Sequence, residues 1–349
     1  MQNFSNVIRI SNRLVGANNP VYVIAEAGVN HNGDMNLAYQ LIDIAVNSGA
    51  DAVKFQLFNT DSLINSDVEK AAYQIDSGKV EQSQYEMLKG LEISPTECEL
   101  LANYAKEKDI DFIVTPFDEP SLSYLLTLPL SALKISSTDL TNLSFIKKAS
   151  KANVPIILST GMSEQSEVDE AMQALVGNCK DLILLQCTSS YPAPISQLNL
   201  RVMKKYADDY GVIVGYSDHT SGIGASPYAV AAGASVIEKH FTIDKSLAGP
   251  DHQASLSPAE LALFIDEIRK VEAMMGRQVK RVELCERDNR LALQKCLVAA
   301  SPIQKGEVLT RENLVARRTG GRGVPAKFLE ELTGRNANIN YAAGAVIES

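Results

Sequence analysis

The sequence predicts an α/β protein in which a TIM (β/α)₈ barrel is followed by a small C-terminal domain. Three observations lead to this prediction: the length of the chain, eight short apolar runs, and a change of character near residue 296. A barrel of this kind takes about 250 residues, so the 349 residues leave room for one further small domain. We expect the barrel over residues 1–276, a charged linker over 277–295 and the second domain over 296–349.

The eight apolar runs are each bounded by Gly, Pro or polar turn residues, as buried strands are. They cover residues 21–28, 52–58, 111–117, 132–138, 155–161, 181–189, 212–218 and 235–242. Segments with helical apolar spacing separate them, such as 35–50 and 144–153. Continuous apolar strands that alternate with helices form parallel sheets, and eight such units are enough to close a barrel.

Two helices have clear start signals, because Ser94 and Ser257 each precede a Pro and lie three residues before a Glu. The helix after Ser257 is expected to be the last of the barrel and to end near Gly276. Residues 59–92 interrupt the alternation with a long polar insertion, and we expect it near the mouth of the barrel, on the substrate side.

The composition excludes several classes of function. A formal net charge of -9 gives no basic surface for nucleic acid, and no segment approaches the 18 or so apolar residues of a membrane span. Residues 1–20 lack the pattern of a signal peptide, and the five cysteines form no CxxC pair. We therefore expect a cytoplasmic protein that binds small molecules.

Polar side chains lie within or just beyond the predicted strands, where a TIM barrel builds its active site. They are Glu26, Lys54, Thr115, Lys134, Ser137, Ser159, Ser189, Ser217, His219, Glu238 and His240. Burying an unpaired ammonium is costly, so the two lysines inside apolar runs favour a functional interpretation. With the hydroxyls at 115, 137, 159, 189 and 217 they can bind a small dianion that carries phosphate and carboxylate.

The absence of a Walker-type Gly-rich loop argues against nucleotide phosphoryl transfer. From spacing alone, a Schiff-base lysine of the kind used by pyruvate aldolases stays open as an alternative for the two lysines. Any of the serines or threonines could also be an ordinary turn or cap hydroxyl.

The chain has only four histidines, at positions 31, 219, 240 and 252. His219 closes the seventh predicted strand and His240 lies in the eighth, so neighbouring strands can place both imidazoles on one divalent metal. Two histidines are too few for a closed structural zinc site, whereas an open site suits Lewis-acid chemistry with Mn²⁺, Mg²⁺ or Co²⁺. The alternative is a hydrogen-bonded histidine pair without metal.

Nine motifs in register give the chain a resemblance to the sialic acid (N-acetylneuraminate) synthase family, which includes legionaminic acid synthases. The motifs are AEAGVNHNG (25–33), ADAVKFQ (50–56), FIVTPF (112–117), LKISSTD (133–139), ILSTGM (157–162), LLQCTSSYPAP (184–194), GYSDHT (215–220), IEKHFT (237–242) and GPDHQASL (249–256). Residues 297–318 are similar to the C-terminal antifreeze-like (SAF) domain of that family.

The resemblance implies a role for each of the residues singled out above and for several others. It implies that phosphoenolpyruvate is held by Lys54, Thr115, Lys134, Ser137, Ser159, Ser189 and Ser217, and that His219 and His240 bind Mn²⁺. It further implies that the acceptor sugar or the reacting centre is faced by Glu26, Gln56, Asp139, Tyr191 and Asp251. Catalysis would then rest on Glu26, Asp139, His219 and His240. The alternative for Glu26 is a structural carboxylate that pairs with Lys54 or Lys134.

Arg318 is implied to reach the active site of the partner subunit in a domain-swapped homodimer. The alternative from the sequence alone is a solvated surface arginine. The sequence departs from the family pattern at three positions: Asp139 replaces a Glu, Ser189 replaces an Asn found in some members, and Thr319 follows the arginine where Pro is common. Asp139 is one methylene shorter than Glu, so its carboxylate reaches less far from the backbone.

The function that the resemblance implies is condensation of phosphoenolpyruvate with N-acetylmannosamine, or a close 2-acetamido hexose, to give N-acetylneuraminate or a related nonulosonic acid. The alternative acceptor is 2,4-diacetamido-2,4,6-trideoxymannose, the substrate of a legionaminic acid synthase. Two rival functions remain: a synthase for a 3-deoxy sugar-acid phosphate, which has no evident use for the C-terminal domain, and a non-catalytic or ice-binding protein.

Overall fold

A computed structural model describes residues 4–70 and 83–348, and the middle of the 59–92 insertion lies outside these described residues. The chain divides into two compact units, Met1–Gly276 and Arg277–Ser349. Each unit is described here by itself. None of the helices in the described ranges has the length and apolar character needed to span a bilayer.

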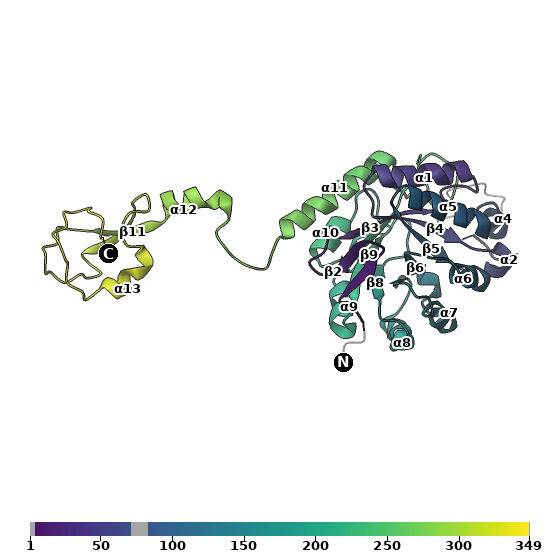
Figure 1. Ribbon diagram of the computed structural model, residues 1–349, viewed down its shortest axis with the longest axis horizontal. Helices are drawn as coiled ribbons and strands as arrows, with labels where there is room; N and C mark the ends of the chain where they lie inside the picture. Colours follow the sequence, from purple (N-terminus) through teal and green to yellow (C-terminus); the bar gives the residue numbers. More distant parts are fainter. Residues whose placement is uncertain (1–3, 71–82, 349) are drawn as a thin grey trace. The chain divides into compact units, whose positions relative to one another are not determined.

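The first unit is a closed barrel of eight parallel strands, which confirms the predicted fold (Figure 1). The strands close in the order β10-β3-β4-β5-β6-β7-β8-β9. Their bounds are β3 (Tyr22–Gly28), β4 (Ala52–Leu57), β5 (Asp111–Pro116), β6 (Ala132–Ile135), β7 (Ile156–Ser159), β8 (Leu182–Cys187), β9 (Ile213–Asp218) and β10 (Val236–His240). Each strand falls within one of the eight apolar runs, which confirms the predicted strands.

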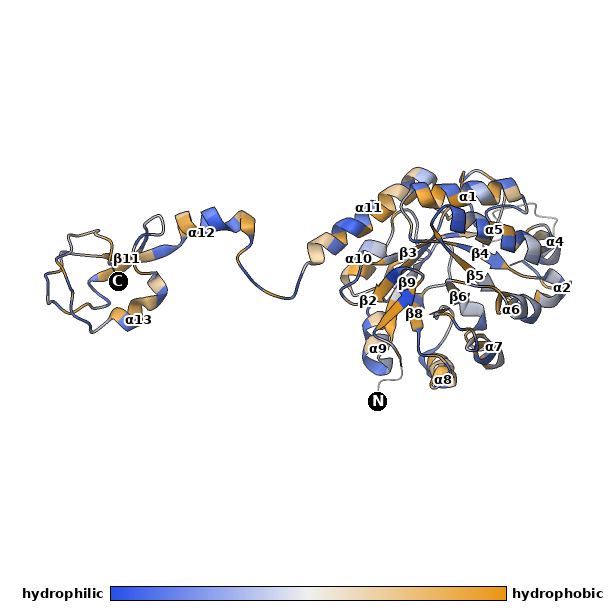
Figure 2. Cartoon of the chain, viewed as in Figure 1, coloured by the Kyte–Doolittle hydropathy of each residue, from blue (hydrophilic) through white to orange (hydrophobic). Residues whose placement is uncertain are grey.

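Helices cover the outside of the barrel, and Figure 2 shows that they carry both hydrophilic and hydrophobic residues. Their bounds are α1 (Met35–Asn47), α2 (Thr60–Leu63), α4 (Gln84–Lys89), α5 (Pro95–Glu107), α6 (Glu119–Leu125), α7 (Leu143–Ala149), α8 (Gln165–Leu175), α9 (Val202–Tyr210), α10 (Ser226–Ala231) and α11 (Pro258–Met275), with short 3₁₀ turns at η1 (Ser137–Asp139) and η2 (Ile195–Gln197). Ser94 and Ser257 both form the predicted capping boxes, and Gly276 ends α11.

A short hairpin that the sequence analysis did not predict packs against the N-terminal ends of the barrel strands. It consists of β1 (Val7–Ile10) and β2 (Arg13–Gly16), which pair in antiparallel register. Ile8, Ile10 and Val15 are buried in one cluster with the apolar residues near the strand starts, such as Tyr22 and Ile157. This end of the barrel interior is therefore apolar, and the polar interior positions lie toward the strand ends.

The second unit contains η3 (Leu284–Glu286), α12 (Arg287–Leu293), β11 (Lys295–Ala299), β12 (Leu314–Arg318), η4 (Ala326–Phe328) and α13 (Leu329–Leu332). Strands β11 and β12 pair in antiparallel register, from Lys295 opposite Arg318 to Ala299 opposite Leu314. A separate small core that includes Leu297, Ile303 and Tyr341 stabilises this unit. The chain therefore carries a compact C-terminal domain after the barrel, as predicted.

Candidate active site

A cavity of about 440 Å³ lies at the C-terminal ends of the barrel strands. Among the predicted site residues of the first unit, all except Asp139 line it. Every barrel strand contributes to the lining. Side chains two residues apart on a strand point to the same side, so a single strand can supply two lining residues. The contributions come from Glu26 on β3, Lys54 and Gln56 on β4, Thr115 on β5, Lys134 on β6, Ser159 on β7, Cys187 and Ser189 on or after β8, Ser217 and His219 on or after β9, and Glu238 and His240 on β10.

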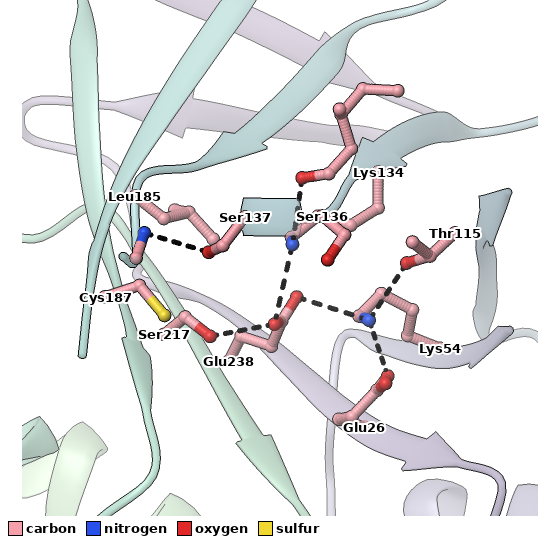
Figure 3. Close-up of polar contacts among 12 residues, drawn as sticks. Glu26, Lys54, Thr115, Lys134, Ser136, Ser137, Leu185, Cys187, Ser217 and Glu238 are labelled. Carbon is pink, nitrogen blue, oxygen red and sulfur yellow. Dashed lines mark hydrogen bonds and ion pairs between the residues drawn. The ribbon is translucent and has the colours of Figure 1, made fainter. Parts of the chain in front are cut away.

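Two lysines and two carboxylates form a charge cluster on the floor of the cavity (Figure 3). Lys54 Nζ lies 2.8 Å from Glu26 Oε2 and 3.7 Å from Glu238 Oε2, while Lys134 Nζ lies 3.8 Å from Glu238 Oε1. All four side chains are at least 94% buried, with exposures of 2–6%. The lysines inside the apolar runs are therefore buried but paired.

The pKa values of these groups move in different directions. Burial raises the pKa of Glu26, and the nearby Lys54 only partly offsets this effect. Glu238 is buried too, but Lys134 and Lys54 together lower its pKa to about 2. Burial lowers the pKa of Lys134, whereas for Lys54 the two carboxylates outweigh burial and raise the pKa. Glu238 is thus a fixed negative charge between two ammonium groups.

Hydroxyl groups surround this cluster. Lys54 Nζ donates to Thr115 Oγ1 at 3.1 Å, and Ser217 Oγ donates to Glu238 Oε1 at 2.9 Å. Ser137 Oγ accepts from the backbone N–H of Gly161 at 2.9 Å. The buried Ser159 Oγ has no hydrogen-bond partner among the described residues. Such donors beside two ammonium groups match the many acceptor oxygens of a phosphate-bearing anion.

His219 and His240 face each other across β9 and β10, with ring centroids 5.7 Å apart. His219 Nδ1 lies 3.0 Å from the carbonyl oxygen of Thr188, and a hydrogen bond there leaves Nε2 free to act as a ligand. His240 Nδ1 is buried without a hydrogen-bond partner among the described residues and lies 4.0 Å from Asp251 Oδ2. Burial lowers the pKa of His240 to about 4, so this imidazole is neutral at pH 7.

This pair fits an open divalent metal site better than a closed one. Within the described ranges, no group of three or more His, Cys, Asp or Glu side chains is arranged to hold a metal ion. Two imidazoles would leave the other coordination positions to water and substrate, as Lewis-acid chemistry requires. The unpaired nitrogen of His240 is the observation that favours a ligand at this position.

Comparison with known proteins identifies the family. The model of the NeuB family matches residues 41–280, and that of the SAF domain matches residues 294–348. The chain belongs to the NeuB family.

The alignments with named relatives cover nearly the whole length of this NeuB chain. It is 44% identical to an N,N'-diacetyllegionaminic acid synthase of Campylobacter jejuni, over 93% of this chain and 98% of the relative. It is 41% identical to the enzyme of the same name from Legionella pneumophila, over 95% of this chain and 94% of the relative. The solved sialic acid synthetase of Leptospira borgpetersenii is 34% identical, with a TM-score of 0.74 over 83% of this chain and 96% of that one.

One predicted site residue of the first unit, Asp139, lies outside the cavity lining of this NeuB chain, and Arg318 belongs to the second unit. Asp139 ends η1, is 9% exposed, and accepts a hydrogen bond from Thr138 Oγ1 at 3.4 Å. Burial raises its pKa to about 6. Arg318 ends β12 in the second unit and is exposed there. The roles expected for both stay predictions.

Two residues of the site had no role assigned from the sequence. Glu238 was noted only as a polar residue in a strand, yet it contacts both lysines and Ser217. The signal was present, since a carboxylate inside an apolar run needs a partner as much as a lysine does. Cys187 was noted only for lacking a paired cysteine, and its Sγ lies 3.7 Å from both His219 Nδ1 and Ser189 Oγ.

Proposed function

We propose that this NeuB chain condenses phosphoenolpyruvate with an N-acetylated amino sugar, forming a nonulosonic acid and releasing phosphate. The observation that carries the proposal is one cavity that holds two buried ammonium groups, a set of hydroxyls and a facing pair of imidazoles. The names of the relatives support it, because they are synthases of acids of this class.

The anion-binding part of the cavity suits phosphoenolpyruvate. We assign its phosphate and carboxylate to Lys54 and Lys134, together with the hydroxyls of Thr115, Ser137, Ser159, Ser189 and Ser217, all of which line the cavity. Charge-assisted hydrogen bonds from an ammonium are about twice as strong as neutral ones. The two lysines are therefore the main determinants of anion affinity in this proposal.

The reaction forms a bond between C3 of phosphoenolpyruvate and the aldehyde carbon of the open-chain sugar. Water then adds at C2, and the C2–O bond to phosphate breaks as phosphate leaves. A divalent metal held by His219 and His240, with Mn²⁺ expected and Mg²⁺ or Co²⁺ as alternatives, would supply Lewis-acid polarisation of the aldehyde.

Side chains of the protein stabilise the developing charge, transfer protons and bind the acceptor sugar. The two lysines offset the charge that grows on the phosphate as it leaves. The Glu26 carboxylate lines the cavity and accepts a hydrogen bond from Gln56 Nε2 at 3.2 Å, so it is held where it can take or give a proton. Tyr191 lies against both imidazoles, with ring centroids 4.2 Å from His219 and 6.0 Å from His240, and together with Gln56 and Asp251 it is assigned to the acceptor sugar.

For the acceptor, we propose 2,4-diacetamido-2,4,6-trideoxymannose ahead of N-acetylmannosamine. The relatives named as diacetyllegionaminic acid synthases are 44% and 41% identical, against 34% for the solved sialic acid synthetase. The two sugars differ only at C4 and C6, so a direct comparison of turnover decides between them.

We also propose a homodimer in the cytoplasm, in which Arg318 reaches the partner's cavity. All five cysteines are free, which suits a reducing compartment. The segment 296–349 has seven Lys or Arg residues against five acidic ones, although the whole chain carries a charge of -9. A locally basic domain of this kind can be attracted to an acidic partner surface.

The test is phosphate release from phosphoenolpyruvate with each of three acceptors: the diacetamido sugar, N-acetylmannosamine and arabinose 5-phosphate. The proposal expects turnover with the first two and a higher kcat/KM for the first. Turnover with arabinose 5-phosphate alone would instead identify a 3-deoxy sugar-acid phosphate synthase. No binding of phosphoenolpyruvate in calorimetry would revive the non-catalytic alternative.

A further inference from the structure

One side of the active-site cavity is mostly apolar, although Gln84 of α4 (Gln84–Lys89) also lines the cavity. The apolar side chains are Phe58, Leu63, Ile64, Met87, Leu88 and Phe117. They follow β4 and β5, and four of them lie on or next to the short helices α2 and α4. These helices belong to the insertion that the sequence placed near the substrate side of the mouth.

Packing behind the surface holds this side of the cavity in place. Phe58 is buried together with Val29 and Leu91, and Leu63, Met87, Leu88 and Phe117 are only partly buried against them. The rings of Phe58 and Phe117 meet edge to face with centroids 6.4 Å apart. The partly buried side chains therefore have a fixed backing and leave apolar surface toward the cavity.

The imidazole pair lies across the barrel from Phe117 on this apolar side. In the closed order β10-β3-β4-β5-β6-β7-β8-β9, strands four places apart face each other, so β4 is opposite β8 and β5 is opposite β9. Phe117 follows β5 and His219 follows β9, while Lys54, Thr115 and Lys134 of the proposed anion site lie within the barrel on β4, β5 and β6. An acceptor whose aldehyde lies at the imidazoles therefore extends its far end across the mouth toward the apolar side.

We propose that Leu63, Ile64, Met87 and Leu88 form an apolar wall that binds the methyl-bearing end of the acceptor and selects a deoxygenated sugar. This inference rests on the proposed function. A hydroxyl pressed against the wall loses its water without gaining a hydrogen-bond partner, whereas a methyl group gains contact. The wall thus discriminates at C6, where one candidate acceptor has a methyl group and the other a hydroxymethyl group.

The test compares three acceptors: N-acetylmannosamine, its 6-deoxy analogue and the diacetamido sugar. The 6-deoxy analogue isolates the change at C6, because nothing else in the sugar differs. The wild type should prefer the 6-deoxy analogue to N-acetylmannosamine in kcat/KM by about tenfold, the lower end of what one apolar contact provides. Met87→Gln and Leu63→Asn should reduce this preference toward unity, with the KM for phosphoenolpyruvate unchanged.

The chain offers matched controls for these variants. Met87→Leu keeps the wall apolar and should keep the preference. Met162→Gln makes the same substitution after β7, on another side of the same cavity, and should leave the preference as in the wild type. Circular dichroism and thermal unfolding show whether each variant is folded, and Leu63→Asn and Met87→Gln test the wall independently of each other.

The outcomes separate the wall from the function on which it rests. An active wild type without preference at C6 would overturn the wall alone, and so would a preference that survives in folded Met87→Gln and Leu63→Asn. An equal loss in Met162→Gln would also overturn it. A wild type that consumes phosphoenolpyruvate with none of the acceptors would overturn the proposed function, and the inference with it.

Discussion

The ammonium of Lys54 lies 2.8 Å from the carboxylate of Glu26, and the two residues are register partners on neighbouring barrel strands. Glu26 thus holds the lysine at the floor of the cavity before any anion binds. Lys54→Met should weaken phosphoenolpyruvate binding by about 10- to 100-fold, since a hydrogen bond to a charged group contributes about 1.5–3 kcal/mol. Calorimetric titration measures this, and the acceptor KM should change less.

A stability control is needed for Lys54→Met, because removing one partner of a buried ion pair leaves the other charge unpaired. The double variant Lys54→Met/Glu26→Gln removes both charges and should recover stability without recovering affinity. Equal loss of affinity for both substrates would contradict the assignment of Lys54 to the anion. An imine trapped by borohydride with pyruvate would show the Schiff-base alternative.

Glu238 offsets the positive charge of Lys54 and Lys134 at the site that the substrate anion enters. Its replacement in Glu238→Gln leaves Lys134 unpaired and weakens the pairing of Lys54, so the free protein should lose about 3–5 kcal/mol of stability. Phosphoenolpyruvate should then raise the unfolding temperature by more than it does in the wild type, because it replaces the missing charge. Thermal unfolding with and without phosphoenolpyruvate measures both effects.

Glu267→Gln is the control for this experiment, since Glu267 forms an exposed pair with Lys270 at 2.7 Å. Exposed pairs contribute about 0–1 kcal/mol, so both its stability and its response to phosphoenolpyruvate should stay close to the wild type. The assignment fails if phosphoenolpyruvate stabilises Glu238→Gln no more than it stabilises the wild type.

The barrel and most of the cavity lining could be predicted from the sequence because they depend on local signals. An apolar run predicts a buried strand, and a charge inside that run, such as Lys54 or Lys134, indicates a partner. Strand closure then brings these charges together, because the polar ends of all eight strands meet at one end of the barrel.

Other features depend on tertiary contacts that cannot be predicted from the sequence. The pairing of Glu238 with both lysines follows from β10 closing the barrel beside β3. The apolar wall could not be predicted because Leu63 and Met87 lie far apart in a polar insertion and come together only by packing against Val29, Phe58 and Leu91. The hairpin at residues 7–16 has strands of only four residues, too short to show a clear period.

The histidine pair leads to a prediction about metal binding. His219→Ala and His240→Ala should each abolish Mn²⁺ binding and activity together while the barrel stays folded, because both side chains face the cavity. Electron paramagnetic resonance of added Mn²⁺ measures binding, and circular dichroism reports the fold. Full activity of the wild type after exhaustive chelation would rule out the metal.

His252 provides the matched control for the histidine pair. It is fully buried and bridges Thr242 Oγ1 at 2.6 Å and Asn32 Oδ1 at 3.1 Å, and it does not line the cavity. His252→Ala should therefore lower thermal stability but keep Mn²⁺ binding. Loss of Mn²⁺ binding in this variant as well would show that the effect is structural and not due to lost ligands.

Asp139 makes stability depend on pH. Burial raises its pKa to about 6 in the folded state, whereas an unfolded Asp titrates near 3.9. Between these values the folded state binds more protons, so its contribution to stability falls as pH rises from about 4 to about 6. A pKa difference of this size corresponds to about 2–3 kcal/mol. Above about pH 6, the folded wild type is less stable by this amount than it would be with an Asp of unshifted pKa.

Asp139→Asn cannot ionise, so its stability relative to the wild type should rise through this pH window and then level off. Urea unfolding of both proteins at pH 4, 5, 6 and 7.5 measures the difference. Parallel stability curves for the two proteins would contradict the raised pKa. Catalytic turnover at pH 7.5, measured on the same samples, tests separately whether Asp139 takes part in the reaction.

The last prediction is that Arg318 completes the active site of the other subunit. Arg318→Ala should raise the acceptor KM with little effect on phosphoenolpyruvate, because a guanidinium can donate to the acyl or hydroxyl oxygens of a sugar. Arg317→Ala is the control, since this neighbour is also exposed on β12. Mixing Arg318→Ala with the barrel variant Lys134→Met should restore activity, because in a two-fold dimer one site of each heterodimer pairs an intact barrel with an intact tail. If mass spectrometry shows that subunits exchange and no activity returns, Arg318 acts within its own chain or not at all.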